Sequence, residues 1–140
     1  MDEVKRELVR EWLQKASRDL TVAKIVARSP EAIWEASLYH CQQAAEKALK
    51  GFLAYWDHPG QKTEDLILLL ENASEIEPCF GTWADAAARL TPYSTANRHP
   101  GTFENSGIED LDEALDDADC IVRQALSFLP PEVHPRAKEG

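Results

Sequence analysis

Cysteines are few in this sequence, and long apolar runs are missing. The three cysteines, Cys41, Cys79 and Cys120, lie far apart and form no Cys-x-x-Cys pair, which is typical of inert thiols in a reducing compartment. No stretch reaches the roughly 18 consecutive apolar residues of a membrane-spanning helix, and no charged-then-apolar leader opens the chain. We therefore expect a cytoplasmic protein that neither crosses a membrane nor carries a secretory signal.

Positive charge is scarce in the second half of the chain. Residues 1–62 contain 10 Lys and Arg against 9 Asp and Glu, whereas residues 63–140 contain 5 against 16. Because binding to a nucleic-acid backbone needs clustered cations, this distribution argues against a general nucleic-acid binder. A nucleotide or RNA would meet the first half together with Arg98, and the acidic half would suit a basic partner.

Motifs that hold cofactors or metals are also missing. The sequence has no P-loop, no Rossmann glycines, and no His-Glu-x-x-His or Gly-x-Ser-x-Gly pattern. Acids do crowd the last predicted helix, but carboxylates of one helix alone rarely bind a divalent cation. We interpret this run as a solvated face or a docking surface for a basic partner, and we expect neither a metal nor a cofactor. The run comprises Glu109, Asp110, Asp112, Glu113, Asp116, Asp117 and Asp119.

Apolar residues recur every three or four positions, which predicts helices, and no strand-like alternation is present. The first predicted helix buries a stripe widened by Val9 and Leu13 and made of Val4, Leu8, Trp12, Ala16, Leu20 and Ala23. We expect an all-α fold, an antiparallel up-and-down bundle of four long helices plus a short one, within a single domain over residues 1–130. Residues 131–140 are expected to form a disordered tail. The predicted helices cover about residues 2–28, a central segment that follows Pro30 and ends near Tyr55, and then 64–75, 82–90 and 106–129.

Local signals suggest where these helices begin. Thr63 is the expected cap of the third helix, and Ser106 opens a capping-box pattern before the last one. Residues 91–106 combine Pro, Ser, Thr, Asn and Gly without an apolar period, so they are expected to form the longest loop.

The central helix carries two adjacent apolar stripes, which predicts that it is packed from both sides. The large stripe contains Trp34, Leu38, Cys41, Ala45, Leu49, Phe52 and Trp56. The small stripe, which allows a second backbone to approach, contains Ile33, Ser37, His40, Ala44, Ala48, Gly51 and Tyr55. Only a narrow polar edge is left on this helix, made of Gln43, Glu46, Lys47 and Lys50.

The same helix carries a family resemblance. The segment His40 to Gly51, His-Cys-Gln-Gln-Ala-Ala-Glu-Lys-Ala-Leu-Lys-Gly, resembles the signature helix of HEPN domains, which are small all-helical proteins. Residues 62–70 resemble the family's Thr-His-x-Leu helix start, with Glu64 in place of His, and residues 93–100 resemble its Tyr…Arg-Tyr-Pro segment, with His99 in place of the second Tyr. The matches occur in family order and span about residues 5–128. The resemblance implies a homodimer that often works beside a minimal nucleotidyltransferase in toxin–antitoxin or nucleotide-handling modules.

Many HEPN proteins are ribonucleases, and the resemblance raises that possibility here. Their activity depends on an Arg and a His separated by four to six residues near the start of the final long helix. This chain lacks that spacing: Arg98 and His99 are adjacent, and after Arg123 the next histidine is His134. We therefore lean against an enzyme, and keep as the alternative an RNase toxin that uses Arg98 and His99 in a shifted arrangement.

Two groups of residues are candidates for ligand binding. In the first, Tyr93 could stack on a base, Arg98 could bind a phosphate, and His99 could titrate near neutrality. The alternative is a structural loop in which Arg98 pairs with an acid of the last helix. The second group is Lys47 and Lys50, which could bind phosphate.

For the two lysines we favour a plainer account, the pairing of Glu46 with Lys50 on a solvated face. We likewise favour a structural role for His40. The preferred hypothesis is a dimeric binding module for a nucleotide or a nucleotidyltransferase partner, and a purely structural dimer is the third alternative. Four tryptophans and two full stripes exceed what a lone small bundle needs, so we expect the dimer to use the first or last helix and part of the central one.

Overall fold

The computed structural model describes residues 2–31, 33–59, 62–94 and 108–136, with the side chain of residue 108 excepted. These residues form an all-α bundle, and no strand occurs among them, so the predicted fold class is confirmed. The long helices are α1 (Glu3–Ala27), α2 (Trp34–Tyr55), α3 (Leu66–Ile76) and α5 (Ile108–Ser127). The short elements are α4 (Ala84–Leu90) and the 3₁₀ helices η1 (Pro78–Trp83), η2 (Thr91–Tyr93) and η4 (Pro131–Val133).

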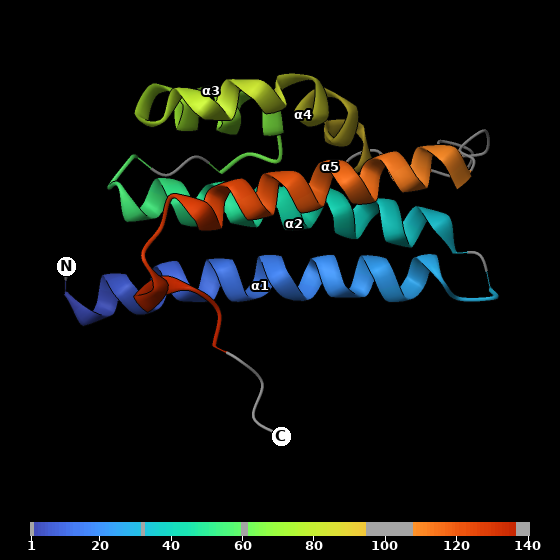
Figure 1. Ribbon diagram of the computed structural model, residues 1–140, viewed down its shortest axis with the longest axis horizontal. Coiled ribbons are helices and arrows are strands. Elements are labelled where there is room, and N and C mark those ends of the chain that lie inside the picture. Colours follow the sequence, from blue (N-terminus) through green and yellow to red (C-terminus); the bar gives the residue numbers. More distant parts are fainter. Residues whose placement is uncertain (1, 32, 60–61, 95–107, 137–140) are drawn as a thin grey trace.

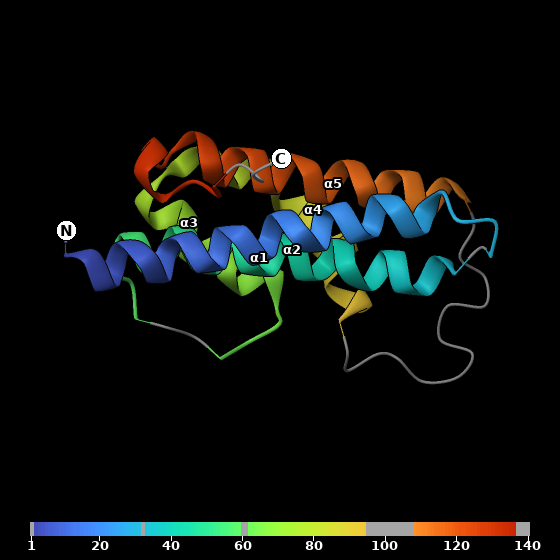
Figure 2. The same ribbon diagram turned by 90° about the horizontal axis from the view of Figure 1, so that it is seen from below.

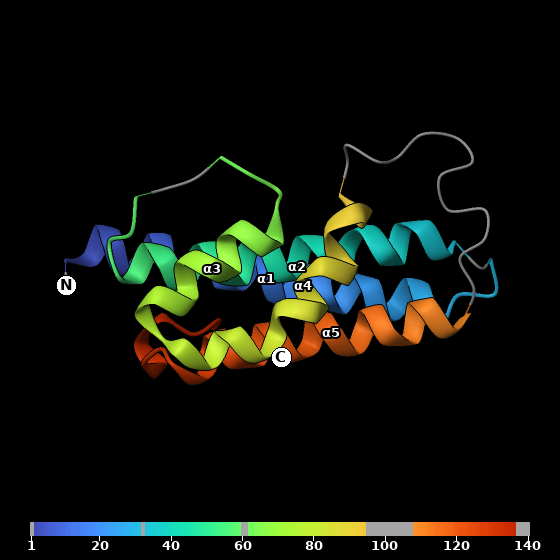
Figure 3. The ribbon, with the colours of Figure 1, turned by 90° about the horizontal axis from the view of Figure 1, so that it is seen from above.

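Helix α2 lies at the centre of the bundle. It packs along α1 on one side and against α5 and α3 on the others, and α3 and α4 cover the face opposite α1 (Figures 1 and 3). Helices α2 and α5 run in the same direction, both from the end of the molecule where α1 finishes (Figure 1). The strict alternation of an up-and-down bundle is therefore not kept. The chain crosses back over the bundle after α2 before it begins α3.

The two stripes of α2 are both buried along the middle of the helix, as predicted. Leu38, Ala45 and Leu49 of the large stripe and Ala44 and Ala48 of the small stripe are completely inaccessible to solvent. The stripes are less well buried at His40, which is partly exposed, and at their ends, where Ile33 is 43% and Trp56 51% exposed. Burial on both sides explains why α2 makes contacts with every other α-helix of the bundle.

The buried stripe of α1 differs from the predicted one. The residues that face the core are Val9, Leu13, Ala16, Leu20 and Ala23. Val4 and Leu8, which were expected in the stripe, are 81% and 48% exposed. Both sets recur every three or four residues, so periodicity alone could not tell which of two overlapping stripes faces α2.

Several helix boundaries differ from the predicted ones. At the start of α3 the difference depends on which side chain satisfies the free backbone N–H groups of the first turn. Asp65, and not Thr63, caps α3: its carboxylate accepts hydrogen bonds from the backbone N–H of Ile67 and Leu68. Thr63 lies two residues earlier, and its hydroxyl accepts the N–H of Asp65 at 3.0 Å. Pro30 belongs to the turn before α2, and residues 91–93 form a 3₁₀ helix within the expected long loop. Ser106 lies outside the described residues.

The expected disordered tail does not begin at residue 131. Residues 131–133 form η4, and Val133 is fully buried. The ring Nε2 of His134 donates to the carbonyl oxygens of Leu126 and Leu129, each at 2.9 Å, and Arg10 donates to the carbonyl of Glu132. Pro130 and Pro131 follow the end of α5, but the packed structure continues beyond them, because the side chain of Val133 is buried in the core.

The three free cysteines differ in burial, and their thiols should therefore differ in reactivity. Burial raises the pKa of Cys41 from 9.0 to about 12, whereas Cys79 is exposed. We expect N-ethylmaleimide at pH 8 to modify Cys79 readily and to leave Cys41 unmodified until the protein is unfolded in urea, as read by mass spectrometry of the peptides. Since only the unfolded chain ionises Cys41 between pH 9.0 and about 12, this thiol should also lower the free energy of unfolding as pH rises through that window. Modification of native Cys41 at the rate of Cys79 would contradict its burial.

Within the part of the chain that the structure describes, no helix is both long and apolar enough to cross a membrane.

Candidate functional site

The polar edge of α2 is built into the protein and is not a solvated face. Gln43 is 8% and Glu46 6% exposed, which corrects the expected solvation of this edge. Gln42 donates to the Glu46 carboxylate at 3.2 Å and to the backbone carbonyl of Glu64 at 3.0 Å, and Gln43 donates to Gln42. The expected pairing of Glu46 with Lys50 is confirmed at 3.1 Å. The edge thus ties the segment before α3 to the central helix.

Asp19 of α1 contacts one residue of the small stripe, His40, and one residue of the polar edge, Lys47. One carboxylate oxygen accepts Nδ1–H of His40 at 2.8 Å, and the other accepts Nζ of Lys47 at 2.5 Å. The side chains of Asp19, Lys47 and His40 are 13%, 22% and 29% exposed. This contact agrees with the structural role expected for His40. Lys47 is likewise neutralised by a largely buried partner, which makes it a poor phosphate ligand.

A groove of about 830 Å³ opens at the end of the bundle where α1 begins and α2 finishes. Its apolar lining comes from α1, α2 and α3 and comprises Val4, Leu8, Trp12, Leu53, Ala54 and Leu69. Its polar lining comprises Asp2, Lys5, Lys50, Asp57, His58 and Lys62. Small-molecule sites occupy roughly 300–1,000 Å³ and combine an apolar lining with a few polar groups, which is the character of this groove.

Two of the three lysines that line this groove lie over aromatic rings. Nζ of Lys50 lies 5.7 Å from the centroid of the Trp12 ring, and Nζ of Lys5 lies 5.9 Å from that of Tyr55. Lys5 also pairs with Asp57 at 2.7 Å, so one of the two acids that line the groove is already neutralised. Lys62 is exposed and has no ion pair with the residues that the structure describes. Three lysines and two aspartates line the groove, and Lys62 is the lysine that these ion pairs leave available.

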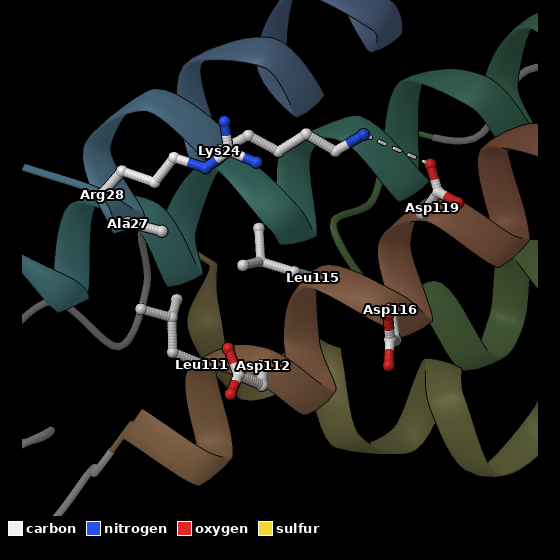
Figure 4. A pocket seen from close by; sticks show the side chains of 8 residues that line it. All are labelled: Lys24, Ala27, Arg28, Leu111, Asp112, Leu115, Asp116 and Asp119. Carbon is white, nitrogen blue, oxygen red and sulfur yellow. Dashed lines mark ion pairs between the residues drawn. The ribbon is translucent and has the colours of Figure 1, made fainter.

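A second, smaller pocket of about 350 Å³ lies between the end of α1 and the first half of α5 (Figure 4). Lys24 and Arg28 approach it from α1, and Asp112, Asp116 and Asp119 line it from α5. Lys24 and Asp119 pair across it at 3.5 Å. Among the described residues, no group of three or more His, Cys, Asp or Glu side chains is arranged to hold a metal ion.

One acid of the α5 run faces inward, unlike its neighbours. Asp117 is 8% exposed and accepts two hydrogen bonds from Arg89 of α4, at 2.8 and 2.9 Å. This bidentate contact raises the pKa of the Arg89 guanidinium and anchors α4 on α5. The expected solvated or docking face is therefore restricted to the exposed acids Glu109, Asp110, Asp112, Glu113 and Asp116.

Tyr93 follows α4 directly and packs against the core. Burial raises the pKa of its phenol, and the carboxylates of Asp110 and Glu113 raise it further, so the hydroxyl stays protonated at neutral pH. The other two residues of this predicted site, Arg98 and His99, lie outside the described residues. Tyr93 is near α5, whereas Lys47 pairs with α1 and Lys50 lines the groove, so the structure does not bring these three residues into one site.

Sequence reasoning missed most of the groove. Trp12 was assigned to the core stripe of the first helix, and Lys5 and Lys62 are more than fifty positions apart in the sequence. The available signal was the positive balance of the first 62 residues, combined with the antiparallel packing expected of two consecutive helices, which brings the end of α2 beside the start of α1. Only the packing of α1 on α2 shows that the Trp12 ring and Lys50 meet.

Comparisons with known proteins agree with this architecture. The family model for the HEPN domain matches residues 9–128. The chain is similar to the crystal structure of TT1696 from Thermus thermophilus, with 25% identity, a TM-score of 0.77, and coverage of 88% of this chain and 99% of that one. It is also similar to ST0689, described as an archaeal HEPN homologue, with 26% identity, a TM-score of 0.69, and coverage of 85% and 95%. No curated protein matches the chain.

Proposed function

This chain belongs to the HEPN domain family, and we propose that it is a binding module for a nucleotide. The observation that carries the proposal is the groove at the start of α1, where an indole ring and three lysines from separate segments line one cavity. An aromatic face with nearby cations suits a ligand that has a flat base at one end and phosphate at the other.

Trp12 and Lys62 have the main roles in the proposed site. The indole of Trp12 offers a stacking surface beside the apolar side chains of Leu8 and Leu53. Lys62 is the best phosphate ligand, because it is exposed and forms no ion pair with the described residues. Lys50 contributes less, since a phosphate would compete with Glu46 for its ammonium group. Lys47 is not part of this site, because Asp19 holds it.

The acidic face of α5 supports a second part of the proposal, a basic protein partner such as a minimal nucleotidyltransferase. Five exposed acids line the first half of this helix, and Arg123 is its only cation. Like-charged patches repel and opposite ones steer association, so such a partner would present lysines or arginines to α5. Three free thiols fit the cytoplasm as the location of this module.

The nucleotide proposal can be tested by calorimetric titration of the protein with ATP and with adenosine. We expect ATP to bind and adenosine to bind more weakly, because it lacks the phosphates that Lys62 would contact. One charge-assisted hydrogen bond contributes about 1.5–3 kcal/mol, so Lys62→Ala should weaken ATP binding roughly tenfold or more. Trp12→Leu should weaken both ligands, because both carry the base.

Lys24→Ala is the matched control, since Lys24 lines the other pocket and should leave ATP binding unchanged. Equal losses in Lys24→Ala and Lys62→Ala, or no heat of binding with millimolar ATP, would count against the groove. Arg98→Ala, measured in the same way, tests the loop residues that the sequence predicts as a ligand site. No described residue favours the RNase alternative, whose Arg98 and His99 lie outside the described part of the chain.

A further inference from the structure

One side of α3 carries a short stripe of exposed and half-buried residues. Ile67, Glu71, Ser74 and Glu75 share this side, because residues three and four positions apart on a helix are neighbours. Ile67 is 42% exposed, although most other apolar side chains of α3 are buried. Figure 3 shows α3 and α4 in front of the other helices, whereas α1 lies on the opposite face of the bundle (Figure 2). The stripe is distinct from Leu69, the α3 residue that lines the groove at the start of α1.

A groove of about 350 Å³, which we call the α3 groove, lies between this stripe and the segment that follows α3. The stripe and Leu70 line it from α3, and Gly81 of η1 and Ala84 of α4 form the other wall. A Cβ atom added at Gly81 would meet no neighbouring part of the described chain within 4 Å, so this glycine does not serve a close packing contact. The space beside Gly81 can therefore accept a side chain from another molecule.

The charged groups that line the α3 groove are two carboxylates, and none of the described residues that line it is a cation. Residues 63–94 contain six Asp and Glu and a single cation, Arg89, which Asp117 already neutralises. Glu71 and Glu75 are exposed, and neither forms an ion pair with the residues that the structure describes. Because they are one helical turn apart, their Cβ atoms are separated by about 5–6 Å. Two cations one turn apart on another helix have the same spacing.

We propose that the α3 groove is a docking site for a short amphipathic helix of another protein, one that carries an apolar side chain beside two Lys or Arg residues one turn apart. The apolar side chain would occupy the space beside Gly81 and contact Ile67 and Leu70. The two cations would pair with Glu71 and Glu75. Helices that bind in grooves combine apolar anchors, which supply affinity, with charges at the rim, which select the partner and fix its register.

The charge of the α3 groove excludes two other kinds of occupant. Nucleic acids and anionic membranes are negatively charged, and the carboxylates of Glu71 and Glu75 would repel both. A wholly apolar segment would leave these two carboxylates without a partner. A segment that is both cationic and apolar satisfies the whole lining of the groove.

This docking site is separate from the two surfaces discussed under the proposed function. Among the described residues, none that lines the α3 groove belongs to α5 or lines the groove at the start of α1. The acidic face of α5 requires only a basic surface, whereas the α3 groove requires an apolar side chain set beside cations. Docking at the α3 groove therefore does not depend on nucleotide binding or on the α5 partner.

A synthetic peptide serves as the probe for this site. The lysine peptide has about 15 residues, long enough to form a helix, with leucines along one face and lysines on both sides of them. Its binding is measured by fluorescence anisotropy at an ionic strength of about 0.15 M, where attraction between distant exposed charges is screened. We expect the lysine peptide to bind the wild-type protein saturably. The glutamate peptide, in which glutamates replace the lysines, should not bind.

Filling the groove tests the place of binding. Gly81→Trp should raise the dissociation constant of the lysine peptide at least about tenfold, because the indole would take up the open space beside Gly81. Gly81→Ala adds only the Cβ atom, so it is the matched control and should bind to within about threefold of wild type. Circular dichroism and the thermal midpoint of each variant establish that the fold is intact.

Charge reversal tests the chemistry of the partner. The double variant Glu71→Lys with Glu75→Lys should lose the lysine peptide at least about tenfold and gain binding of the glutamate peptide, because both rim charges change sign. A damaged fold could not produce that gain. Glu31→Lys with Glu35→Lys is the matched control, since it makes the same change in net charge at exposed positions that do not line the groove. It should bind the lysine peptide to within about threefold of wild type.

Several results would overturn the proposal. One is the absence of saturable binding of the lysine peptide to the wild-type protein, and another is unaltered binding to Gly81→Trp. Equal losses in the two charge-reversed double variants would show that the peptide responds only to net charge. Failure of the Glu71→Lys, Glu75→Lys variant to bind the glutamate peptide would show that these two carboxylates do not pair with the partner.

Discussion

Replacing Gly51 by leucine should destabilise the bundle strongly, because α1 and α2 are in close contact there. A Cβ atom added at Gly51 would lie only 3.1 Å from Cβ of Trp12 and 3.1 Å from Cδ2 of Leu13. The rest of a leucine side chain could be placed only by moving α1 away from α2. Overpacking of this kind typically costs about 1–3 kcal/mol, and the urea midpoint should fall accordingly.

Two controls separate crowding from helix propensity. Gly51→Ala gains about 1 kcal/mol of helix propensity and loses a similar amount to the close contact, so its midpoint should stay near that of wild type. Ala88→Leu adds a comparable side chain at an exposed position of α4 and should change stability by less than about 0.5 kcal/mol. If Gly51→Leu were as stable as Ala88→Leu, α1 and α2 would not be in close contact. Since Trp12 adjoins Gly51, the damaged variant should also bind ATP more weakly.

The sequence predicts the packing of α2 well because its pattern of apolar residues is compatible with only one arrangement, a central helix that is buried on two sides. Two adjacent apolar stripes require burial on both sides, and small residues at Ala44, Ala48 and Gly51 require a close neighbour. These residues are buried as expected. The Glu46–Lys50 pair follows from spacing alone, since residues four apart on a helix are neighbours.

The pattern of α1 is ambiguous, and this is why its exposed residues were assigned to the core. Val4 and Leu8 can be read as the start of the stripe that contains Ala16 and Leu20, or as the start of an exposed stripe that continues through Val22 and Ile25. A helix with apolar residues on two faces does not show which face its own fold covers. Contacts with α2 decide that Val9 and Leu13 face inward.

The candidate site could not be predicted from local patterns, because its residues come from separate helix ends. Trp12, Lys50 and Lys62 meet only after α1 and α2 pack and the chain crosses back to α3. The burial of Gln43 and Glu46 was missed for a related reason. Both side chains contact Gln42, which in turn donates to the backbone carbonyl of Glu64, and no side-chain pattern predicts a backbone acceptor.

The Arg89–Asp117 pair connects the stability of the fold to the predicted Tyr93 site. Arg89 of α4 forms two hydrogen bonds with Asp117 of α5, and Tyr93 lies three residues after the end of α4. The two partners are unequally buried: the side chain of Arg89 is 44% exposed, whereas that of Asp117 is 10% exposed. The cost of breaking the pair therefore depends on which partner is removed.

Arg89→Ala should be considerably more destabilising than Asp117→Ala. Without Arg89, the carboxylate of Asp117 stays buried and loses the hydrogen bonds that it makes with the described residues. Leaving a buried charged group unsatisfied costs about 1–3 kcal/mol or more. Without Asp117, the guanidinium of Arg89 can turn to water, and alanine is a better helix former than aspartate, so the loss should be below about 1 kcal/mol.

Urea denaturation of both variants and of the double variant would measure this asymmetry. Arg123→Ala is the control, because Arg123 is 77% exposed and its pair with Asp119 lies on the surface, where such pairs contribute about 0.2–1 kcal/mol. Asp117→Ala should partly rescue Arg89→Ala, since it removes the charge left unpaired. Equal losses in the two single variants, or a double variant less stable than Arg89→Ala, would mean that Asp117 is satisfied by water and that α4 is held on α5 chiefly by its buried Ala86, Ala87 and Leu90.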